Sequence, residues 1–235
     1  MLAAGLSSRM GRNKLLLELG GEPLVRRAVR TALGAGLGPV LVVTGHQREG
    51  IEAALAGLAC TPVFNPDYAR GMNTSLRAGF RAVPDACAGA VVLLGDMPFI
   101  EREHVARLCE AFRAGSAKIV LSRFGGVTAP PILYGAGAFD ALRALPDDAP
   151  GKSVIEMYRS ETAAVEQPAA ALRDLDFPAD VEAARPHFEC RSLNGVEAPE
   201  SGAPARCQVT GIGLRPQPPE PPGRGSAAAG AASQS

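Results

Sequence analysis

Short apolar runs alternate along most of the chain with longer segments whose apolar residues recur every three or four positions. Val40 to Thr44 and Ala90 to Leu94 are continuous apolar runs, as expected for strands that are covered on both faces. The apolar positions between Leu24 and Leu33 have helical spacing, and Gly34 follows as a stop signal. Strands that alternate with helices indicate a parallel sheet with right-handed crossovers. The pattern therefore predicts an α/β fold with a mostly parallel central sheet.

The same pattern predicts where the other elements lie. Further helices are expected around Leu76 and over residues 48–58, 102–113, 138–145, 152–158 and 179–185. Further strands are expected over residues 1–4, 61–64, 118–122, 132–134 and 172–176, and residues 125–131 are expected to form a loop. Residues 1–4 are short for a strand at the centre of a sheet. Either this strand is truncated or the true start of the protein lies upstream.

Composition divides the 235 residues into two parts. Residues 1–188 have the length and apolar content of one folded domain with a sizeable core. The remaining residues become rich in Pro, Gly, Ala and Ser, above all from about Asn194. Such a segment cannot bury enough apolar surface to offset the entropy that is lost when it becomes ordered. We therefore expect one domain over residues 1–188 and a disordered tail over residues 189–235.

Charge and cysteine usage narrow the choice of partners and compartment. The chain has 24 basic and 24 acidic residues, so its net charge favours neither nucleic acid nor a membrane as a partner. No apolar run is long enough to span a bilayer, and no secretory signal is evident. The five cysteines are far apart and form no C-x-x-C pair, which is compatible with a reducing compartment. We expect a cytoplasmic protein in which any anion-binding site is local.

The segment from Leu2 to Lys14 has the residue types of a phosphate-holding loop. Small residues let a ligand lie against the main chain, and successive backbone N–H groups of such a loop can bind an anion. Hydroxyl groups add donors, and Arg and Lys side chains add positive charge. The candidate residues are Leu2, Ala3, Ala4, Gly5, Ser7, Ser8, Arg9 and Lys14. The spacing matches neither a P-loop nor a dinucleotide fingerprint, and a plain surface turn is the alternative.

Three other segments carry candidate ligands. Asp96 directly follows a strongly apolar predicted strand, at the sheet edge where ligands bind in open α/β folds. Its carboxylate suits Mg²⁺ that is shared with substrate phosphates, and Asp176 would supply a second carboxylate. Gly71, Met72 and Ser75 begin a predicted helix and offer backbone donors, a hydroxyl and a surface for a flat base. Each segment also has a purely structural explanation, namely a turn carboxylate, a helix cap and a helix start with a core methionine.

Taken together, three motifs make the chain resemble the molybdopterin nucleotidyltransferase family. They are L-A-A-G-L-S-S-R-M-G-R-N-K at residues 2–14, N-P-D-Y-A-R-G-M-N-T-S-L-R-A-G at 65–79 and G-D-M-P at 95–98. Within that family the chain is most similar to the molybdenum cofactor cytidylyltransferases, and the likeness spans most of residues 1–187. The resemblance implies a three-layer Rossmann-like nucleotidyltransferase fold that binds an NTP and Mg²⁺.

The resemblance also implies how the nucleotide is held. Leu2 to Gly5 would hold the base and ribose, and Gly71 to Ser75 would frame the nucleoside. Arg9 and Lys14 would hold the phosphates. In this family L-A-A-G goes with CTP and L-A-G-G with GTP, so Ala4 favours CTP.

The two candidate carboxylates would bind the metal ion. Asp96 lies in the G-D-M-P motif, and Asp176 lies in D-L-D-F-P-A-D, which matches an acidic motif of the family. Arg9, Lys14 and Asp96 would then be the catalytic residues. One segment departs from the family: Val127 to Pro131 stands where an Arg-Gly-x-Pro-like segment often faces the second substrate.

The implied activity is transfer of a cytidylyl group from CTP to the phosphate of molybdenum–molybdopterin, with release of pyrophosphate. The implied partners are CTP or another NTP, a molybdopterin-type phosphate acceptor, and a molybdoenzyme or its maturation factor. The scattered His and Cys residues offer no persuasive nucleophile, which agrees with direct displacement. Two alternatives stay open: a nucleotidyltransferase for a sugar or polyol phosphate, and a non-catalytic accessory protein for the molybdenum cofactor.

Overall fold

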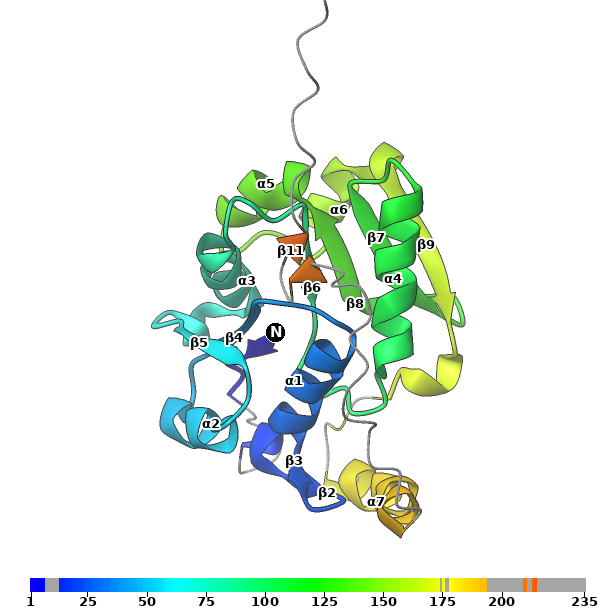
Figure 1. The fold of residues 1–235 in the computed structure, drawn as a ribbon. Helices are drawn as coiled ribbons and strands as arrows, with labels where there is room; N and C mark the ends of the chain where they lie inside the picture. Colours follow the sequence, from blue (N-terminus) through cyan, green and yellow to red (C-terminus); the bar gives the residue numbers. More distant parts are fainter. Residues whose placement is uncertain (7–12, 174, 176–177, 194–208, 211–212, 215–235) are drawn as a thin grey trace, which may run out of the picture.

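The computed structural model describes residues 1–6, 13–173, 175, 178–193, 209–210 and 213–214. In this part of the chain a central β-sheet lies between two layers of helices (Figure 1). Most neighbouring strands in the sheet run parallel. The structure therefore confirms the three-layer α/β fold with a mostly parallel sheet.

The sheet consists of two parts that meet at β1. The first part has the parallel order β5-β4-β1, with β1 at Leu2–Ala3, β4 at Val40–Thr44 and β5 at Cys60–Phe64. The second part has the order β6-β8-β7-β9, with β6 at Gly89–Val92, β7 at Ile119–Phe124, β8 at Val127–Gly135 and β9 at Thr162–Gln167. Only β8 is antiparallel to its neighbours in this part.

A short parallel bridge joins the two parts of the sheet. Leu2 is paired with Leu94, and the Leu2 N–H donates to the Leu93 carbonyl at 2.9 Å. Strand β1 therefore lies between β4 on one side and the extension of β6 on the other. The carboxyl ends of these strands meet at one edge of the sheet, which is where parallel α/β sheets bind ligands.

Helices cover both faces of the sheet. One face carries α1 (Leu24–Gly34), α2 (Arg48–Ala54) and α4 (Arg102–Ala114). The other face carries α3 (Met72–Ala82), α5 (Phe139–Arg143) and α6 (Ser153–Met157). The buried apolar side chains of each group share a separate core with the strands. Of the apolar positions that predicted an amphipathic helix at Leu24–Leu33, Leu24 packs in a third cluster and the others face the first core.

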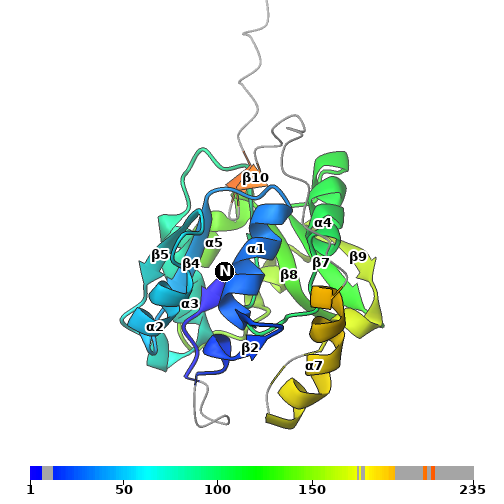
Figure 2. The ribbon, with the colours of Figure 1, turned by 60° about the horizontal axis from the view of Figure 1, so that its bottom comes forward.

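A third, smaller cluster attaches the last helix to the start of the chain. The hairpin of β2 (Glu18–Leu19) and β3 (Glu22–Pro23) lies next to α7 (Pro178–Leu193), as Figure 2 shows. Leu19, Phe99, Leu175 and Phe188 are buried together there.

The described part of the chain also contains short 3-10 turns. They are η1 (Lys14–Leu16), η2 (Tyr68–Arg70), η3 (Ala136–Ala138), η4 (Arg159–Glu161) and η5 (Ala169–Ala171).

The predicted loop from Gly125 to Pro131 is wrong. Its two glycines, with φ of +54° and +89°, form a tight turn, and β8 begins directly after them. Its two prolines have no backbone N–H to donate to a neighbouring strand. The pairing with β7 shifts register at these prolines, so neither has a regular partner in the ladder. The buried hydroxyl of Ser122 instead donates to the Pro131 carbonyl at 2.7 Å. A bulge of this kind lets a strand carry prolines that a regular ladder would exclude.

The strand predicted over residues 172–176 is also wrong. Leu172, Arg173 and Leu175 lie outside any strand, and the place beside β7 is taken by β9. An edge strand pairs on one side only, so β9 can use the mixed sequence Thr-Ala-Ala-Val-Glu-Gln and shows no apolar run. The helix predicted over residues 48–58 ends earlier, at Ala54.

The predicted tail over residues 189–235 stays a prediction. Helix α7 continues across its boundary to Leu193. Beyond that helix the structure describes only β10 (Val209–Thr210) and β11 (Gly213–Leu214), an antiparallel pair beside β6 (Figure 1). No helix in the described part of the chain has the length and apolar character needed to cross a bilayer.

Candidate active site

A cavity of about 320 Å³ opens at the carboxyl ends of β1 and β6, beside the first turn of α3. Segments that are far apart in sequence meet there because the parallel strands that precede them end at the same sheet edge. The predicted site residues that line this cavity are Leu2, Ala4, Gly5, Lys14, Gly71, Met72, Ser75 and Asp96.

Lys14 and Asp96 form an ion pair in this cavity. The Lys14 Nζ lies 2.6 Å from Asp96 Oδ2, and the two side chains are 16% and 21% exposed. The pair is therefore shielded on one side and open to the cavity on the other. It brings together a cation suited to phosphate oxygens and a carboxylate suited to a divalent cation.

Local packing places each member of the ion pair. Buried Asn13 precedes η1, and its Oδ1 accepts from the Leu15 N–H at 3.1 Å, which caps the turn that begins with Lys14. The Gly95 N–H donates to the Leu2 carbonyl at 3.2 Å, so the turn that carries Asp96 is bound to β1. A side chain at Gly95 would come within 3.1 Å of Leu15, so glycine lets η1 approach this turn closely.

The opposite wall is the start of α3, which a buried amide holds in place. Asn65 is 2% exposed, and its Nδ2 donates to the hydroxyl groups of Thr74 at 2.8 Å and Ser75 at 3.0 Å. Its Oδ1 accepts from the Asp67 N–H at 3.0 Å. Gly71 precedes the helix with φ of +121°, a region that side chains rarely allow. The wall therefore has a defined shape before any ligand arrives.

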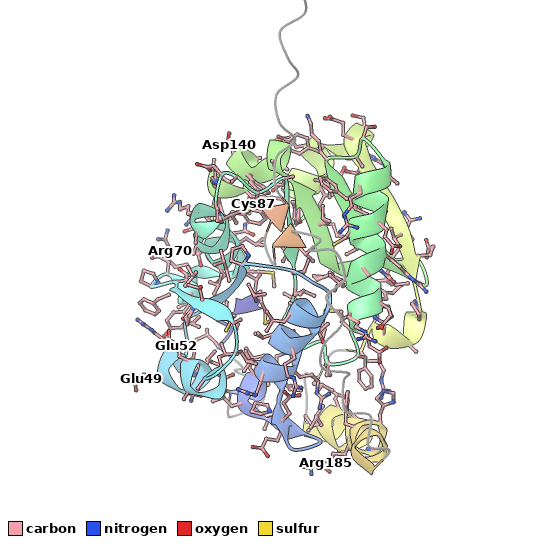
Figure 3. The ribbon with its side chains drawn as sticks, in the orientation of Figure 1. Glu49, Glu52, Arg70, Cys87, Asp140 and Arg185 are labelled. Carbon is pink, nitrogen blue, oxygen red and sulfur yellow. The ribbon has the colours of Figure 1, made fainter. Side chains whose placement is uncertain are left out.

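A second layer of contacts supports this wall from outside. The Asn73 Nδ2 donates to the carbonyls of Pro146 and Ala149, both at 2.9 Å. The Asp147 carboxylate pairs with Arg77 at 2.5 Å and also with Arg70. The Arg77 hydrogen bond, with further help from Arg70, lowers the pKa of Asp147 below its usual value. Arg70 lies beside α3 at the end of the sheet (Figure 3).

Among the predicted site residues that the structure describes, Ala3 does not line the cavity. Ala3 is 1% exposed and its side chain packs into the first core. Its neighbours in the chain, Leu2 and Ala4, line the cavity instead. Ser7, Ser8, Arg9 and Asp176 lie outside the described residues. The residue before Asp176, Leu175, is buried in one cluster with Leu17 and Phe99, which follow the segments that carry Lys14 and Asp96.

The sequence pattern missed several residues that shape the site. Tyr68 and Leu15 line the cavity, and Asn13 and Asn65 hold two of its segments. Asn65 directly follows a predicted strand. Because an Asn side chain at such a position often bonds to the backbone of the following turn, its role could have been predicted. Tyr68 has no such signal, because its place depends on contacts with a distant glycine.

The comparisons with known proteins agree with this arrangement of motifs and cavity. A family model described as the MobA-like NTP transferase domain matches residues 1–165. The chain belongs to this family. It is therefore an α/β nucleotidyltransferase, and the cavity at its sheet edge is the candidate active site.

Relatives of this MobA-like chain have different descriptions. The purine catabolism protein PucB of Bacillus subtilis is 29% identical over 194 residues, which cover 78% of this chain and 93% of that protein. A nucleotidyl transferase from Methanothermobacter (Mth528) has a TM-score of 0.69 at 25% identity, covering 81% of this chain and 96% of that one. Molybdopterin-guanine dinucleotide biosynthesis protein A from Archaeoglobus fulgidus has a TM-score of 0.58 at 19% identity, with coverage of 81% and 97%, and shows a shared fold.

Proposed function

We propose that this MobA-like enzyme transfers a cytidylyl group from CTP to the phosphate of molybdenum–molybdopterin. The observation that carries the proposal is the Lys14–Asp96 ion pair, which faces the first turn of α3 across a cavity of about 320 Å³. An anionic triphosphate needs positive charge and a metal-binding carboxylate at one end. A nucleoside needs backbone donors and an apolar surface at the other. Both ends are present among the described residues.

The reaction is a direct displacement at the α-phosphorus of CTP. An anionic oxygen of the acceptor phosphate forms the new P–O bond, and the bond to the bridging oxygen breaks, so that pyrophosphate leaves with the electron pair. The attacking oxygen carries no proton, so no general base is needed. The work of the protein is to align the two substrates and to neutralise charge. Lys14, with Arg9, would stabilise the charge on the transferred and leaving groups.

The donor set at the site fits Mg²⁺. This ion usually takes one or two carboxylates together with substrate phosphates and water. No group of three potential metal-holding side chains occurs among the described residues, whereas the Asp96 carboxylate lines the cavity. We propose Asp96, with Asp176, as the protein ligands, and a bound Mg²⁺ would neutralise phosphate charge during transfer. The burial of Leu175 beside Leu17 and Phe99 supports Asp176 as the second ligand.

The acceptor is proposed from the family and from the sequence motifs. The Archaeoglobus fulgidus neighbour is described as a molybdopterin-guanine dinucleotide biosynthesis protein, which supports a molybdopterin-type acceptor. The name of PucB refers to purine catabolism, which supports delivery of the product to a molybdoenzyme of that process or to its maturation factor. Ala4, in the L-A-A-G motif at the cavity, supports CTP as the nucleotide.

The test is to incubate the protein with Mg²⁺, molybdenum-loaded molybdopterin and each of the four common NTPs in turn. We expect pyrophosphate release chiefly with CTP, and a product whose mass equals that of the acceptor plus one cytidylyl group. Transfer to a sugar or polyol phosphate in place of the pterin would overturn the acceptor. Cofactor binding without pyrophosphate release from any NTP would overturn catalysis.

A further inference from the structure

Tyr68 separates the candidate active-site cavity from a second hollow. The second hollow, of about 590 Å³, lies over the end of β4 and the start of α2, and Gly45, Arg48 and Phe64 line it. Among the described residues, Tyr68 is the one that lines both spaces. Its side chain therefore forms the partition between them.

The topology of the sheet places Tyr68 on the opposite side of β1 from Asp96. Asp96 follows the extension of β6, whereas Tyr68 lies against Gly45 at the end of β4. Strand β1 runs between these two strands. If the triphosphate binds at Lys14 and Asp96, the flat base at the other end of the nucleotide points toward Tyr68 and the neighbouring start of α3.

Tyr68 can occupy this position because residue 45 is a glycine. A Cβ atom at Gly45 would lie 2.6 Å from Tyr68 Cβ and 2.7 Å from its Cγ, which is closer than non-bonded atoms approach. The same Cβ would lie 2.9 Å from the Cβ of Ala4. Tyr68 thus sits directly on the main chain of Gly45 and beside Ala4. Its ring is also near His46, with centroids 6.3 Å apart.

We infer that Tyr68 determines which nucleotide the enzyme uses, by closing the base end of the cavity against a two-ring purine. The inference rests on the proposed transfer from CTP and extends it to a residue outside the L-A-A-G motif. With the ring present, the base site ends at Tyr68 and holds a one-ring pyrimidine. Without the ring, the site opens into the hollow of about 590 Å³ and admits a purine.

The test compares kcat/KM for CTP and GTP, with the same acceptor, in variants of Tyr68. Tyr68→Ala removes the partition, so the preference for CTP over GTP should fall by about tenfold or more, chiefly because GTP is used better. Tyr68→Phe keeps the ring and should retain the wild-type preference. Phe64→Ala is the matched control, since Phe64 is 45% exposed and lines only the outer hollow. This control should also keep the preference.

Each outcome separates this inference from the proposed function. A wild-type enzyme that transfers no nucleotide from any NTP contradicts the proposed function itself. An active Tyr68→Ala enzyme with an unchanged CTP to GTP ratio contradicts the role of Tyr68 alone. If Tyr68→Ala does not fold, Tyr68→Leu decides in the same way, because leucine keeps an apolar contact on Gly45 but lacks the ring.

Discussion

The two walls of the active-site cavity are built in different ways. On one side the Lys14 Nζ lies 2.6 Å from the Asp96 carboxylate, and both side chains are partly open to the cavity. On the other side the start of α3 is held by buried Asn65 and Asn73, each of which makes several hydrogen bonds. We expect removal of a partner on the first wall to act mainly through the charge that is offered to the substrate. Removing one on the second wall leaves buried polar groups unsatisfied, so binding and stability change together.

The largest effect is expected from Lys14→Met, which keeps much of the side-chain volume and removes the charge. We expect kcat for pyrophosphate release to fall by about 10²–10³-fold, because charge on the transferred phosphate is no longer neutralised. The melting temperature should change little. Lys118→Met is the matched control, since Lys118 pairs with Glu161 at 2.9 Å away from the cavity and is 40% exposed. A Lys14→Met enzyme with wild-type kcat would contradict the role of the first wall.

Asn65→Ala tests the second wall. The change removes two donated hydrogen bonds and one accepted bond at a site that is 2% exposed. We expect a loss of about 2–3 kcal/mol in the free energy of unfolding, measured by urea denaturation, together with a higher KM for CTP. Thr61→Ala, at an exposed position on β5, should cost little. A normal KM at undiminished stability would show that the wall does not depend on Asn65.

A smaller effect is expected from Asp147→Asn, which weakens the outer support of the same wall. Asp147 pairs with Arg70 and with Arg77, and ion pairs near the surface contribute modestly. We expect the KM for CTP to rise by about two- to fivefold while kcat is unchanged. Asp140→Asn, whose carboxylate is 97% exposed in its pair with Arg143, serves as the control. A fall in kcat without any change in KM would contradict a purely supporting role.

The smallest effect concerns pH and lies away from the cavity. His104 Nδ1 accepts from the Glu101 N–H at 2.9 Å at the start of α4, so the imidazole must be neutral there. Burial, helped by Arg107, lowers the pKa of His104, whereas Glu101 and Glu103 raise it. A lowered pKa in the folded state gives stability that is present above the ordinary value of about 6.5 and is lost as the pH falls below it.

The measurement is the urea midpoint at pH 7.5 and pH 5.5 for the wild type and for His104→Gln. Between pH 7.5 and pH 5.5 the free energy of unfolding should fall further in the wild type than in the variant. We expect the difference between the two falls to be below about 1 kcal/mol. An equal pH dependence in both proteins would show that His104 does not contribute.

Much of the fold and part of the site follow from the sequence. Val40 to Thr44 has the same bounds in the pattern and in β4, because a strand covered on both faces needs an unbroken apolar run. The meeting of Lys14, Asp96 and Ser75 follows from parallel strands that end at one edge of the sheet. These features depend on local pattern and on topology, both of which a sequence carries.

The parts that the sequence did not predict depend on partners far along the chain. Gly125 to Pro131 becomes a turn and a strand only because β8 bulges where it pairs with β7 and Ser122 supplies a donor. Tyr68 reaches the cavity only because Gly45 has no side chain. In each case the residue type is unremarkable by itself, and the position follows from tertiary packing.

The most direct test of the division between the two walls is Asp96→Asn, measured for pyrophosphate release over a range of Mg²⁺ concentrations and for melting temperature in the same preparation. Asn keeps the shape of Asp and removes the charge that pairs with Lys14 and would bind the metal ion. We predict a loss of at least about 10²-fold in kcat, which high Mg²⁺ restores only in part, with an unchanged melting temperature. Turnover within about twofold of the wild type at ordinary Mg²⁺ would contradict the placement of the chemistry at this ion pair.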